Sequence, residues 1–276
     1  MTIRAQVAGI GHYLPERIVP NAEFEKTLET SDEWIRTRSG IERRHFAAPE
    51  ETTSILATHA ARAALKDAGL EPSDLDALIV ATSTPDLTFP SAATMVQARL
   101  GMTGGFAFDV QAVCAGFVYA LTTANALIIS GQVRRVMVIG AETFSRIMDW
   151  TDRSTCVLFG DGAGALILEA GEGTGDSSDR GILSTDLHSD GQFRDLLYVD
   201  GGVSTNSIGH LRMEGKEIFR HAVEKLASTA TAALDKAGLT AEDVDWVVPH
   251  QANIRIITGT AKKLGLPMEQ VIVTVQ

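Results

Sequence analysis

Two segments far apart in the chain share one sequence pattern. Residues 62–82, RAALKDAGLEPSDLDALIVAT, align without a gap on residues 231–251, TAALDKAGLTAEDVDWVVPHQ. Each copy is an amphipathic stretch that ends in Ala-Gly-Leu, followed by Asp-x-Asp and then by an apolar run of strand length. Solenoid repeats recur every ~20 to 50 residues, much more closely than these two copies. The pattern therefore predicts two related α/β halves, and the alternative is a chance similarity of two helix-turn-strand units.

Short apolar runs alternate with longer amphipathic stretches along the chain. Helices are predicted at residues 54–69, with Thr53 or Ser54 as the N-cap and Gly69 as the stop, and at residues 216–238. Buried strands are predicted at residues 76–82, 104–110, 135–142 and 164–170. This alternation is typical of an α/β fold.

Glycine-rich segments interrupt this pattern at three places. The loop at residues 171–181, GEGTGDSSDRG, is predicted to be exposed and to separate an N-terminal half, residues 1–170, from a C-terminal half, residues 182–276. The stretches VAGIG and FGDGAG resemble nucleotide-binding loops, but neither leads into a helix as phosphate loops do. Tight turns are the better interpretation of both.

Charge and cysteine content exclude several classes of protein. A formal net charge of −11 without a concentrated basic face argues against nucleic-acid binding. No run approaches the ~18 apolar residues of a membrane-spanning helix. The first residues read as a strand, without the apolar region of a signal peptide. The only two cysteines, Cys114 and Cys156, indicate neither a disulfide framework nor a zinc site, so we expect a cytoplasmic protein.

Cys114 is the first candidate for chemistry. It lies in FDVQAVCAGFVYALTTANALIISG, where an apolar strand turns directly into a helix that begins at or near the cysteine. Unpaired backbone N–H groups and the dipole at a helix N-terminus stabilise a thiolate and can lower a cysteine pKa. The same N–H groups can bind the oxyanion that forms when the sulfur attacks a carbonyl. An inert buried cysteine is the alternative interpretation.

His250 is the second candidate. It follows the apolar run WVVP, so it is predicted to lie where a strand of the second half meets its loop, a usual location of α/β sites. A nucleophile and a histidine are a familiar catalytic pair. A purely structural histidine is the alternative, and the other histidines show no spacing that suggests a metal site.

A predicted helix after His250 places Arg255, Lys262 and Lys263 on one face. The patch is interpreted first as a solvated helix end whose lysines suit the dipole, and the alternative is a docking site for an acidic partner protein. Trp34 lies in a segment with several arginines and could stack on a nucleotide ring, or else cover the core from a helix surface. The arginines of that segment are Arg36, Arg38, Arg43 and Arg44.

Seven motifs, taken in order, carry a family resemblance. They are TSDEWIRTRSGI, FPSAA, FDVQAVCAGF, TDRST, FGDGAGA, LRMEGKEIF and WVVPHQANIRII. With these motifs the chain resembles β-ketoacyl-acyl-carrier-protein synthase III, the initiating condensing enzyme of type II fatty acid synthesis. The resemblance runs from the first predicted strand to Gln276. It implies a thiolase-like, duplicated five-layer αβαβα fold, which agrees with the internal repeat.

The resemblance also implies roles for individual residues. Cys114 would accept the acyl group, His250 would polarise the malonyl thioester carbonyl, and Phe89 of FPSAA would reach across a homodimer interface to close the partner's acyl pocket. Residues expected to bind coenzyme A and the acyl chain are Trp34, Arg38, Phe89, Arg153, Phe159, Gly215 and Asn253. Residues expected to bind the acyl carrier protein are Gln251, Ala252, Asn253, Ile254, Arg255, Lys262 and Lys263.

The implied reaction has two halves. The Cys114 thiolate takes an acyl group, by default acetyl, from acyl-CoA, and coenzyme A leaves. Malonyl carrier protein then loses carbon dioxide, and the resulting enolate carbon attacks the acyl-cysteine to give 3-oxoacyl carrier protein. Apart from the coenzyme A thioester, which is a substrate, no cofactor and no metal is expected.

The sequence departs from the family pattern at one place. The family's third catalytic residue, an asparagine in an H-G-N-T-S segment, should follow VIVTVQ, but the sequence stops at Gln276. We therefore expect a truncated record or an unresolved C-terminus, because a genuine 276-residue chain would fold poorly and condense negligibly. The alternatives are a related thiolase-superfamily synthase with another acyl acceptor, and an inactive fragment that only binds a partner protein.

Overall fold

The computed structural model describes residues 2–276, and the chain divides into two compact units. Unit 1 contains the residues up to Arg17, His45–Thr143 and Gly160–Thr185, and unit 2 contains Ile18–Arg44, Phe144–Phe159 and Asp186–Gln276. These units differ from the predicted halves, residues 1–170 and 182–276, because the chain enters unit 2 twice before residue 170. Unit 1 is therefore discontinuous in sequence, which the linear repeat does not indicate.

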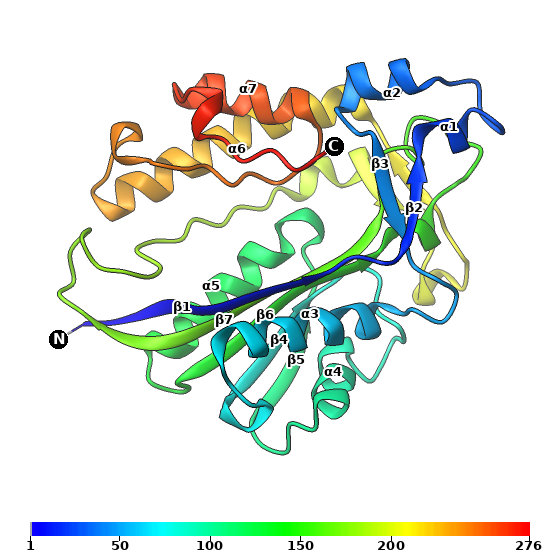
Figure 1. Ribbon diagram of the computed structural model, residues 1–276. Helices are drawn as coiled ribbons and strands as arrows, with labels where there is room; N and C mark the ends of the chain where they lie inside the picture. The colour runs from blue at the N-terminus through cyan, green and yellow to red at the C-terminus, as the bar shows by residue number, and fades with distance from the viewer. Residues whose placement is uncertain (1) are drawn as a thin grey trace. The chain divides into compact units, whose positions relative to one another are not determined.

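Unit 1 is built on a five-stranded sheet with the strand order β1-β7-β6-β4-β5 (Figure 1). The central strand β4 is parallel to β5 and β6, β7 is antiparallel to β6, and β1 is antiparallel to β7. The strands are β1 (Thr2–Tyr13), β4 (Ala77–Ala81), β5 (Phe106–Val110), β6 (Arg135–Thr143) and β7 (Asp161–Gly173). The four strands predicted from apolar runs are confirmed.

Helices cover both faces of this sheet. α3 (Thr53–Ala68) and α4 (Ala92–Leu100) lie on one face and α5 (Gly116–Ile129) lies on the other (Figure 1). All five residues of β4 are buried and apolar, as expected for a strand that is covered on both sides. Its side chains alternate between two core clusters, one formed with α3 and α4 and the other with α5.

The boundaries of α3 differ slightly from the prediction. The N-cap position is Thr52, whose side chain makes no capping hydrogen bond, so the prediction of Thr53 or Ser54 as the N-cap is wrong. Those two side chains bond instead to the loop after β4: the Thr53 hydroxyl donates to the Thr84 carbonyl (2.6 Å), and the Ser54 hydroxyl donates to the Asp86 carboxylate (2.7 Å). The helix ends at Gly69, as predicted, with a left-handed φ of 65°.

The two glycine-rich stretches are not tight turns, so that prediction is wrong. Both lie within long strands: VAGIG is part of β1, and most of FGDGAG belongs to β7, its pairing partner. A Cβ atom added to Gly11 would lie only 2.4 Å from the Ala60 carbonyl oxygen of α3. The glycine therefore lets helix and strand backbones approach closely, a role that a pattern of turn residues does not distinguish.

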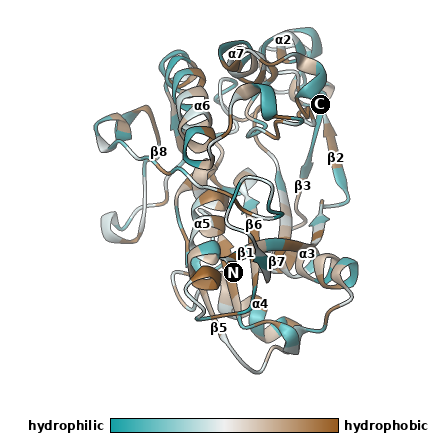
Figure 2. Cartoon of the chain, turned by 90° about the vertical axis from the view of Figure 1, so that its left-hand side faces the viewer, coloured by the Kyte–Doolittle hydropathy of each residue, from teal (hydrophilic) through white to brown (hydrophobic). Residues whose placement is uncertain are grey.

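Unit 2 is mainly helical. Its elements include α1 (Asn21–Phe24), α2 (Asp32–Ser39), α6 (Gly215–Ala237), α7 (Ile254–Leu264) and the hairpin of β8 (Leu197–Val199) and β9 (Leu211–Met213). β2 (Arg17–Pro20) and β3 (Arg43–Phe46) form a separate two-stranded sheet. The predicted helix at residues 216–238 is confirmed as α6, which packs along α7 and carries hydrophilic and hydrophobic residues along its length (Figure 2).

The apolar run before His250 forms less β structure than the prediction requires. Its one bridge joins Val247 to Val271 in parallel, with the Val247 N–H donating to the Gln270 carbonyl (2.8 Å). Its other apolar side chains lie largely in solvent, since Trp246 is 63% exposed and Val248 is 76% exposed. Within residues 2–276, no helix combines the length and apolarity needed to cross a bilayer.

Candidate active site

In unit 1, the carboxyl ends of three adjacent parallel strands, β6, β4 and β5, meet at one edge of the sheet. This edge is where open α/β sheets usually form their sites. The chain leaves β5, forms a 3₁₀ turn at Val113–Ala115 and then enters α5. Cys114 is the middle residue of that turn and is exposed. The predicted strand-cysteine-helix arrangement is therefore confirmed, with the cysteine just before the helix.

The backbone around Cys114 is constrained on both sides. Val113 has a φ of 47°, a left-handed value that a β-branched residue adopts only at a cost. After the cysteine, a Cβ atom on Gly116 would lie 3.3 Å from the Ala81 Cβ at the end of β4. The small residue thus allows the first turn of α5 to lie against the sheet edge, which fixes where the cysteine is presented.

The surroundings of Cys114 do not favour its thiolate. Protein atoms that crowd the thiol, together with the carboxylate of Glu142, raise its pKa, while a backbone hydrogen bond at the cysteine lowers it. The net direction is upward, so the expectation of a lowered pKa at a helix N-terminus is wrong. Although Cys114 is exposed as a residue, the protein atoms around its sulfur displace water and disfavour the charged form, and this effect outweighs the backbone hydrogen bond.

Glu142, at the end of β6, is a residue that sequence reasoning missed. Its carboxylate accepts hydrogen bonds from the Ser83 N–H (2.9 Å), the Thr84 hydroxyl (2.5 Å) and the Thr82 hydroxyl (3.3 Å). Burial raises the pKa of Glu142, and the hydrogen bonds oppose that effect. An acidic residue at the end of the otherwise apolar run RVMVIGAE was the signal that could have identified it.

Phe89 lies in the loop between β4 and α4. The hydrogen bonds from Thr82, Ser83 and Thr84 to Glu142 fix the beginning of this loop. The Phe89 side chain is 82% exposed, and the peptide bond to Pro90 is cis. After the loop, the Asp109 carboxylate accepts hydrogen bonds from the Ala92 and Ala93 N–H groups at the beginning of α4. A large apolar side chain is thus presented to solvent from a loop that is anchored at both ends.

His250 belongs to unit 2 and is exposed, although protein atoms around the ring lower its pKa. The imidazole is therefore neutral at neutral pH and carries one N–H donor. The next residue, Gln251, is tied to the chain by its amide, which donates to the Pro249 carbonyl (3.0 Å) and the Ile272 carbonyl (3.1 Å). Its amide oxygen accepts from the Thr274 N–H (2.8 Å). These bonds use the amide to fix the backbone beside His250.

The residues after Gln251 form the beginning of α7. Asn253 is its N-cap, because its side-chain oxygen accepts a hydrogen bond from the Ile256 N–H (2.9 Å). Arg255, Lys262 and Lys263 are exposed on the helix, as predicted. Two of them also contact α6: the Arg255 guanidinium lies 5.3 Å from the centre of the Phe219 ring, and Lys263 pairs with Glu224.

Only some of the arginines near Trp34 in the sequence lie close to its ring in the structure. The guanidinium groups of Arg38 and Arg153 lie over its ring, 4.4 Å and 5.2 Å from the ring centre. Arg153 also donates a hydrogen bond to the Glu29 carbonyl. Arg44 is different, because its side chain is buried and donates to the Val19 and Val157 carbonyls (3.1 and 2.7 Å). It is therefore part of the core rather than of a surface cluster.

The remaining candidates have mainly local contacts. Phe159 stacks on Phe144, with ring centres 5.1 Å apart, and Gly215 is the first residue of α6. Cys156 is fully buried, and burial raises the pKa of its thiol to about 11. In the part of the chain that the structure describes, no three His, Cys, Asp or Glu side chains form a group that could hold a metal ion.

Two family models match the chain. Residues 108–191 match 3-oxoacyl-[acyl-carrier-protein (ACP)] synthase III, and residues 234–276 match the C-terminal model of the same family. The β-ketoacyl-[acyl-carrier-protein] synthases III of Ruegeria pomeroyi and Roseobacter denitrificans are each 76% identical to this chain over 276 residues. In both cases the alignment covers 100% of this chain and 85% of the relative.

Solved structures agree with these relatives. The 3-oxoacyl-[acyl-carrier-protein] synthase III of Aquifex aeolicus matches with a TM-score of 0.92 and 47% identity, covering 99% of this chain and 84% of that one. The enzyme of Pseudomonas aeruginosa matches with a TM-score of 0.91 and 42% identity, covering 99% and 83%. These likenesses confirm the predicted thiolase-like α/β fold.

Proposed function

The chain belongs to the 3-oxoacyl-[acyl-carrier-protein] synthase III family, and on that premise we propose how its residues carry out the family's reaction. It is an enzyme, an acyltransferase that performs the condensation initiating fatty acid synthesis. The observation that carries the proposal is the placement of Cys114 in a strained turn between a parallel strand and a helix N-terminus. The substrates are acyl-CoA, by default acetyl-CoA, and malonyl carrier protein.

Cys114 is the nucleophile of the first half-reaction. Its sulfur attacks the thioester carbonyl of acyl-CoA, a new carbon–sulfur bond forms, and the bond to the coenzyme A sulfur breaks. The proton of the cysteine leaves with the coenzyme A thiol, so charge balances. In this proposal the unpaired N–H groups at the beginning of α5 bind the developing oxyanion, since α5 starts two residues after Cys114.

His250 acts in the second half-reaction as a hydrogen-bond donor. Loss of carbon dioxide from the malonyl thioester leaves an enolate, and a neutral imidazole N–H stabilises its oxygen. The enolate carbon attacks the acyl carbon on Cys114, a carbon–carbon bond forms and the acyl carbon–sulfur bond breaks. The Cys114 sulfur leaves as a thiolate and takes up a proton from water. The lowered pKa of His250 is compatible with this role, because the neutral ring keeps one N–H that can donate to the enolate oxygen. Gln251 holds the backbone on which the ring is mounted.

Trp34, Arg38 and Arg153 bind the nucleotide end of coenzyme A. An indole ring flanked by two guanidinium groups offers a stacking surface for adenine and positive charge for phosphates. The pantetheine arm then passes residues Phe159, Gly215 and Asn253. No metal or further cofactor is required, because neither half-reaction changes an oxidation state and the chain itself supplies the nucleophile and the donors.

The exposed cations of α7 bind the acyl carrier protein. Arg255, Lys262 and Lys263 offer positive charge on a chain whose formal net charge is −11, so an acidic partner is attracted to this helix in particular. The neighbouring residues of the docking surface are Gln251, Ala252, Asn253 and Ile254. Of these, Gln251 contributes through its backbone, because its amide is engaged inside unit 2.

The enzyme works as a homodimer in the cytoplasm. β5 is an edge strand of the unit 1 sheet, and Phe106 on it is 43% exposed. An apolar edge strand favours pairing with a second chain. Phe89, 82% exposed on its anchored loop, then has a partner surface to enter, where it closes the acyl pocket of the second subunit.

Separate assays of the two half-reactions test this proposal. Exchange of labelled coenzyme A into acetyl-CoA reports acylation, and release of carbon dioxide from malonyl carrier protein reports decarboxylation. Cys114→Ala should abolish exchange, whereas His250→Ala should abolish decarboxylation and leave exchange within about a factor of ten. Retention of exchange by Cys114→Ala would contradict the assignment of the nucleophile.

A further inference from the structure

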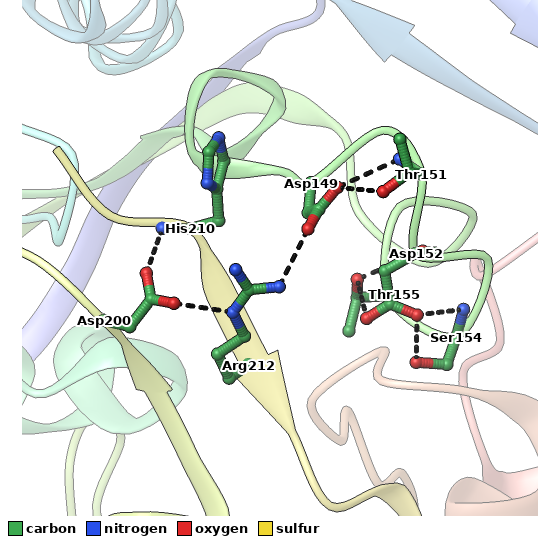
Figure 3. A network of polar contacts seen from close by, with 8 residues as sticks. All are labelled: Asp149, Thr151, Asp152, Ser154, Thr155, Asp200, His210 and Arg212. Carbon is green, nitrogen blue, oxygen red and sulfur yellow. Dashed lines mark hydrogen bonds and ion pairs between the residues drawn. The ribbon is translucent and has the colours of Figure 1, made fainter.

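One arginine in unit 2 is clamped between two carboxylates. Arg212, on β9, donates from Nε to the Asp200 carboxylate (2.7 Å) and from Nη1 to the Asp149 carboxylate (2.8 Å). Figure 3 shows the guanidinium between the two acidic side chains, which come from different segments of the chain. One planar guanidinium can make both bonds at once because its donors are fixed in a fork. Arg212 therefore links the β8–β9 hairpin to the loop that carries Asp149.

The hairpin side of this clamp is held by further hydrogen bonds. Tyr198 on β8 pairs with Arg212 on β9, and just beyond the pairing the Asp200 carboxylate accepts a hydrogen bond from the His210 N–H (2.6 Å). The Asp200 N–H in turn donates to the His210 carbonyl (3.1 Å). Arg212 thus reaches towards Asp149 from a β hairpin whose loop end is held by further bonds between Asp200 and His210 (Figure 3).

The loop side of the clamp leads directly to Arg153. Asp149 also accepts hydrogen bonds from the Thr151 N–H (3.1 Å) and hydroxyl (2.6 Å), so the loop folds around its carboxylate. Asp152 forms the next turn by accepting from the Ser154 N–H (2.9 Å) and hydroxyl (2.6 Å). Arg153 is the central residue of this second turn, and its guanidinium extends over the ring of Trp34.

We propose that Arg212 is a positioning residue for the nucleotide end of acyl-CoA, because through Asp149 it holds the loop that presents Arg153 to Trp34. This inference rests on the proposed function, in which Trp34 and Arg153 bind that end of the substrate. Arg212 itself is not a catalytic residue.

The charges of the clamp agree with this arrangement. The hydrogen bonds from Arg212 and His210 hold the pKa of Asp200 below its usual range, and those from Thr151 and Arg212 do the same for Asp149. Both carboxylates are therefore ionised at neutral pH. Because all three side chains are partly exposed, the clamp is weakened by salt, and the effect of its loss is modest rather than complete.

A comparison of two acyl donors shows whether Arg212 positions the coenzyme A site or only stabilises the fold. Acetyl-CoA carries the nucleotide end, and acetyl-pantetheine carries the same thioester without it. Arg212→Gln should raise KM for acetyl-CoA about three- to tenfold, the size expected for the loss of two partly exposed ion pairs. Its kcat with acetyl-CoA, and its kcat/KM with acetyl-pantetheine, should remain within about twofold of the wild type. Arg212→Lys should show part of the same rise, because an ammonium group cannot hold both carboxylates in the geometry of the fork.

Arg220→Gln is the matched control. Arg220 pairs with Glu217 within α6 and is more exposed than Arg212, so its loss removes a surface ion pair that does not involve Asp149. The Arg220→Gln variant should have the wild-type KM for both acetyl-CoA and acetyl-pantetheine. Asp200→Asn is the second variant, since it loosens only the far side of the clamp and should raise KM for acetyl-CoA by about twofold even if Arg212→Gln fails to fold.

The outcomes distinguish this inference from the function on which it rests. If Trp34→Ala and Arg153→Ala raise KM for acetyl-CoA selectively but Arg212→Gln and Asp200→Asn do not, the positioning role is wrong and the coenzyme A site stands. An equal loss with both donors in the Arg212 variants likewise overturns it, as general damage. If Trp34→Ala and Arg153→Ala do not discriminate between the donors, the proposed coenzyme A site itself is wrong.

Discussion

Val113 holds a left-handed φ of 47° directly before Cys114, so the residue that presents the candidate nucleophile is itself strained. Such a backbone costs a non-glycine residue roughly 1–2 kcal/mol, and a β-branched side chain is among the least suited to it. The strain persists because β5 fixes the chain before the turn and α5 fixes it afterwards. The position of Cys114 is thus imposed by the fold rather than by local preference.

This strain reverses the usual effect of glycine and alanine on the free energy of unfolding. At most positions alanine is the more stabilising residue, but at residue 113 we expect Val113→Gly to have the higher free energy of unfolding, by roughly 0.5–1 kcal/mol over Val113→Ala. Urea denaturation of both variants measures the difference. If the alanine variant is as stable as the glycine variant or more so, the backbone at residue 113 is not strained.

Glu142 should control the ionisation of the nucleophile. Burial is the largest cause of the raised pKa of Cys114, and the negative charge of Glu142 adds to it by repelling the thiolate. Removing that charge in Glu142→Gln should lower the pKa, so more thiolate is present at neutral pH and iodoacetamide alkylates Cys114 faster. The rate of alkylation against pH measures the shift.

A matched control separates charge from general disturbance. Glu50 is exposed in the same unit and is not among the groups that shift the pKa of Cys114. Glu50→Gln should therefore leave the alkylation profile unchanged. A Glu142→Gln profile that stays at the wild-type position, or moves to higher pH, would show that its carboxylate does not destabilise the thiolate.

Gly11 should not tolerate a side chain. A Cβ atom there would lie 2.3 Å from the Ala64 N and 2.4 Å from the Ala60 carbonyl oxygen, both in the backbone of α3, which cannot turn aside as a flexible side chain can. We expect Gly11→Ala to reduce the free energy of unfolding by about 1–3 kcal/mol or more. Gly164 on the adjacent strand is the control, because nothing lies within 4 Å of its added Cβ. Equal stability of the two variants in thermal denaturation would refute the close approach of β1 to α3.

Gln251 should act on catalysis through His250. Gln251→Ala removes the bonds to Pro249, Ile272 and Thr274 that hold the backbone beside the imidazole. We expect decarboxylation of malonyl carrier protein to fall about ten- to hundredfold, because small displacements of a donor weaken transition-state stabilisation, while acylation of Cys114 changes little.

Gln270→Ala tests whether this effect is specific. Gln270 makes the same kind of bond, from its amide to the Val244 carbonyl (3.0 Å), but not beside His250. It should affect decarboxylation much less than Gln251→Ala. An equal fall in both variants, or an equal fall in acylation, would assign Gln251 to the general stability of unit 2.

The fold of unit 1 could be predicted from the sequence where burial has a simple pattern. The run ALIVA is apolar throughout because it lies in the centre of a sheet covered on both faces, and apolar periodicity reports that situation directly. The glycines of VAGIG misled the same reasoning. Their cause is the close approach of α3, a segment about fifty residues away, and local patterns carry no record of such a neighbour.

Some residues of the candidate site could be predicted from the sequence, and others could not. Cys114 and His250 were identified because each follows an apolar run of strand length, and Trp34 because arginines lie near it in the sequence. Arg44 was misplaced because its burial depends on carbonyl groups of Val19 and Val157, which no local pattern brings near. Glu142 and Arg212 were missed for the same reason. Each gains its role from partners on other elements, and a charged residue at the end or middle of a strand reads by itself as solvated.

The intact mass of the protein before and after incubation with acetyl-CoA, followed by peptide mapping, tests the central claim most directly. The account predicts a single added acetyl group per chain, located on the peptide that contains Cys114, and no adduct in Cys114→Ala. The buried Cys156, whose pKa burial raises to about 11, should remain unmodified. An acetyl group on any other residue, or none at all on correctly folded protein, would contradict the assignment of Cys114 as the acyl-accepting nucleophile.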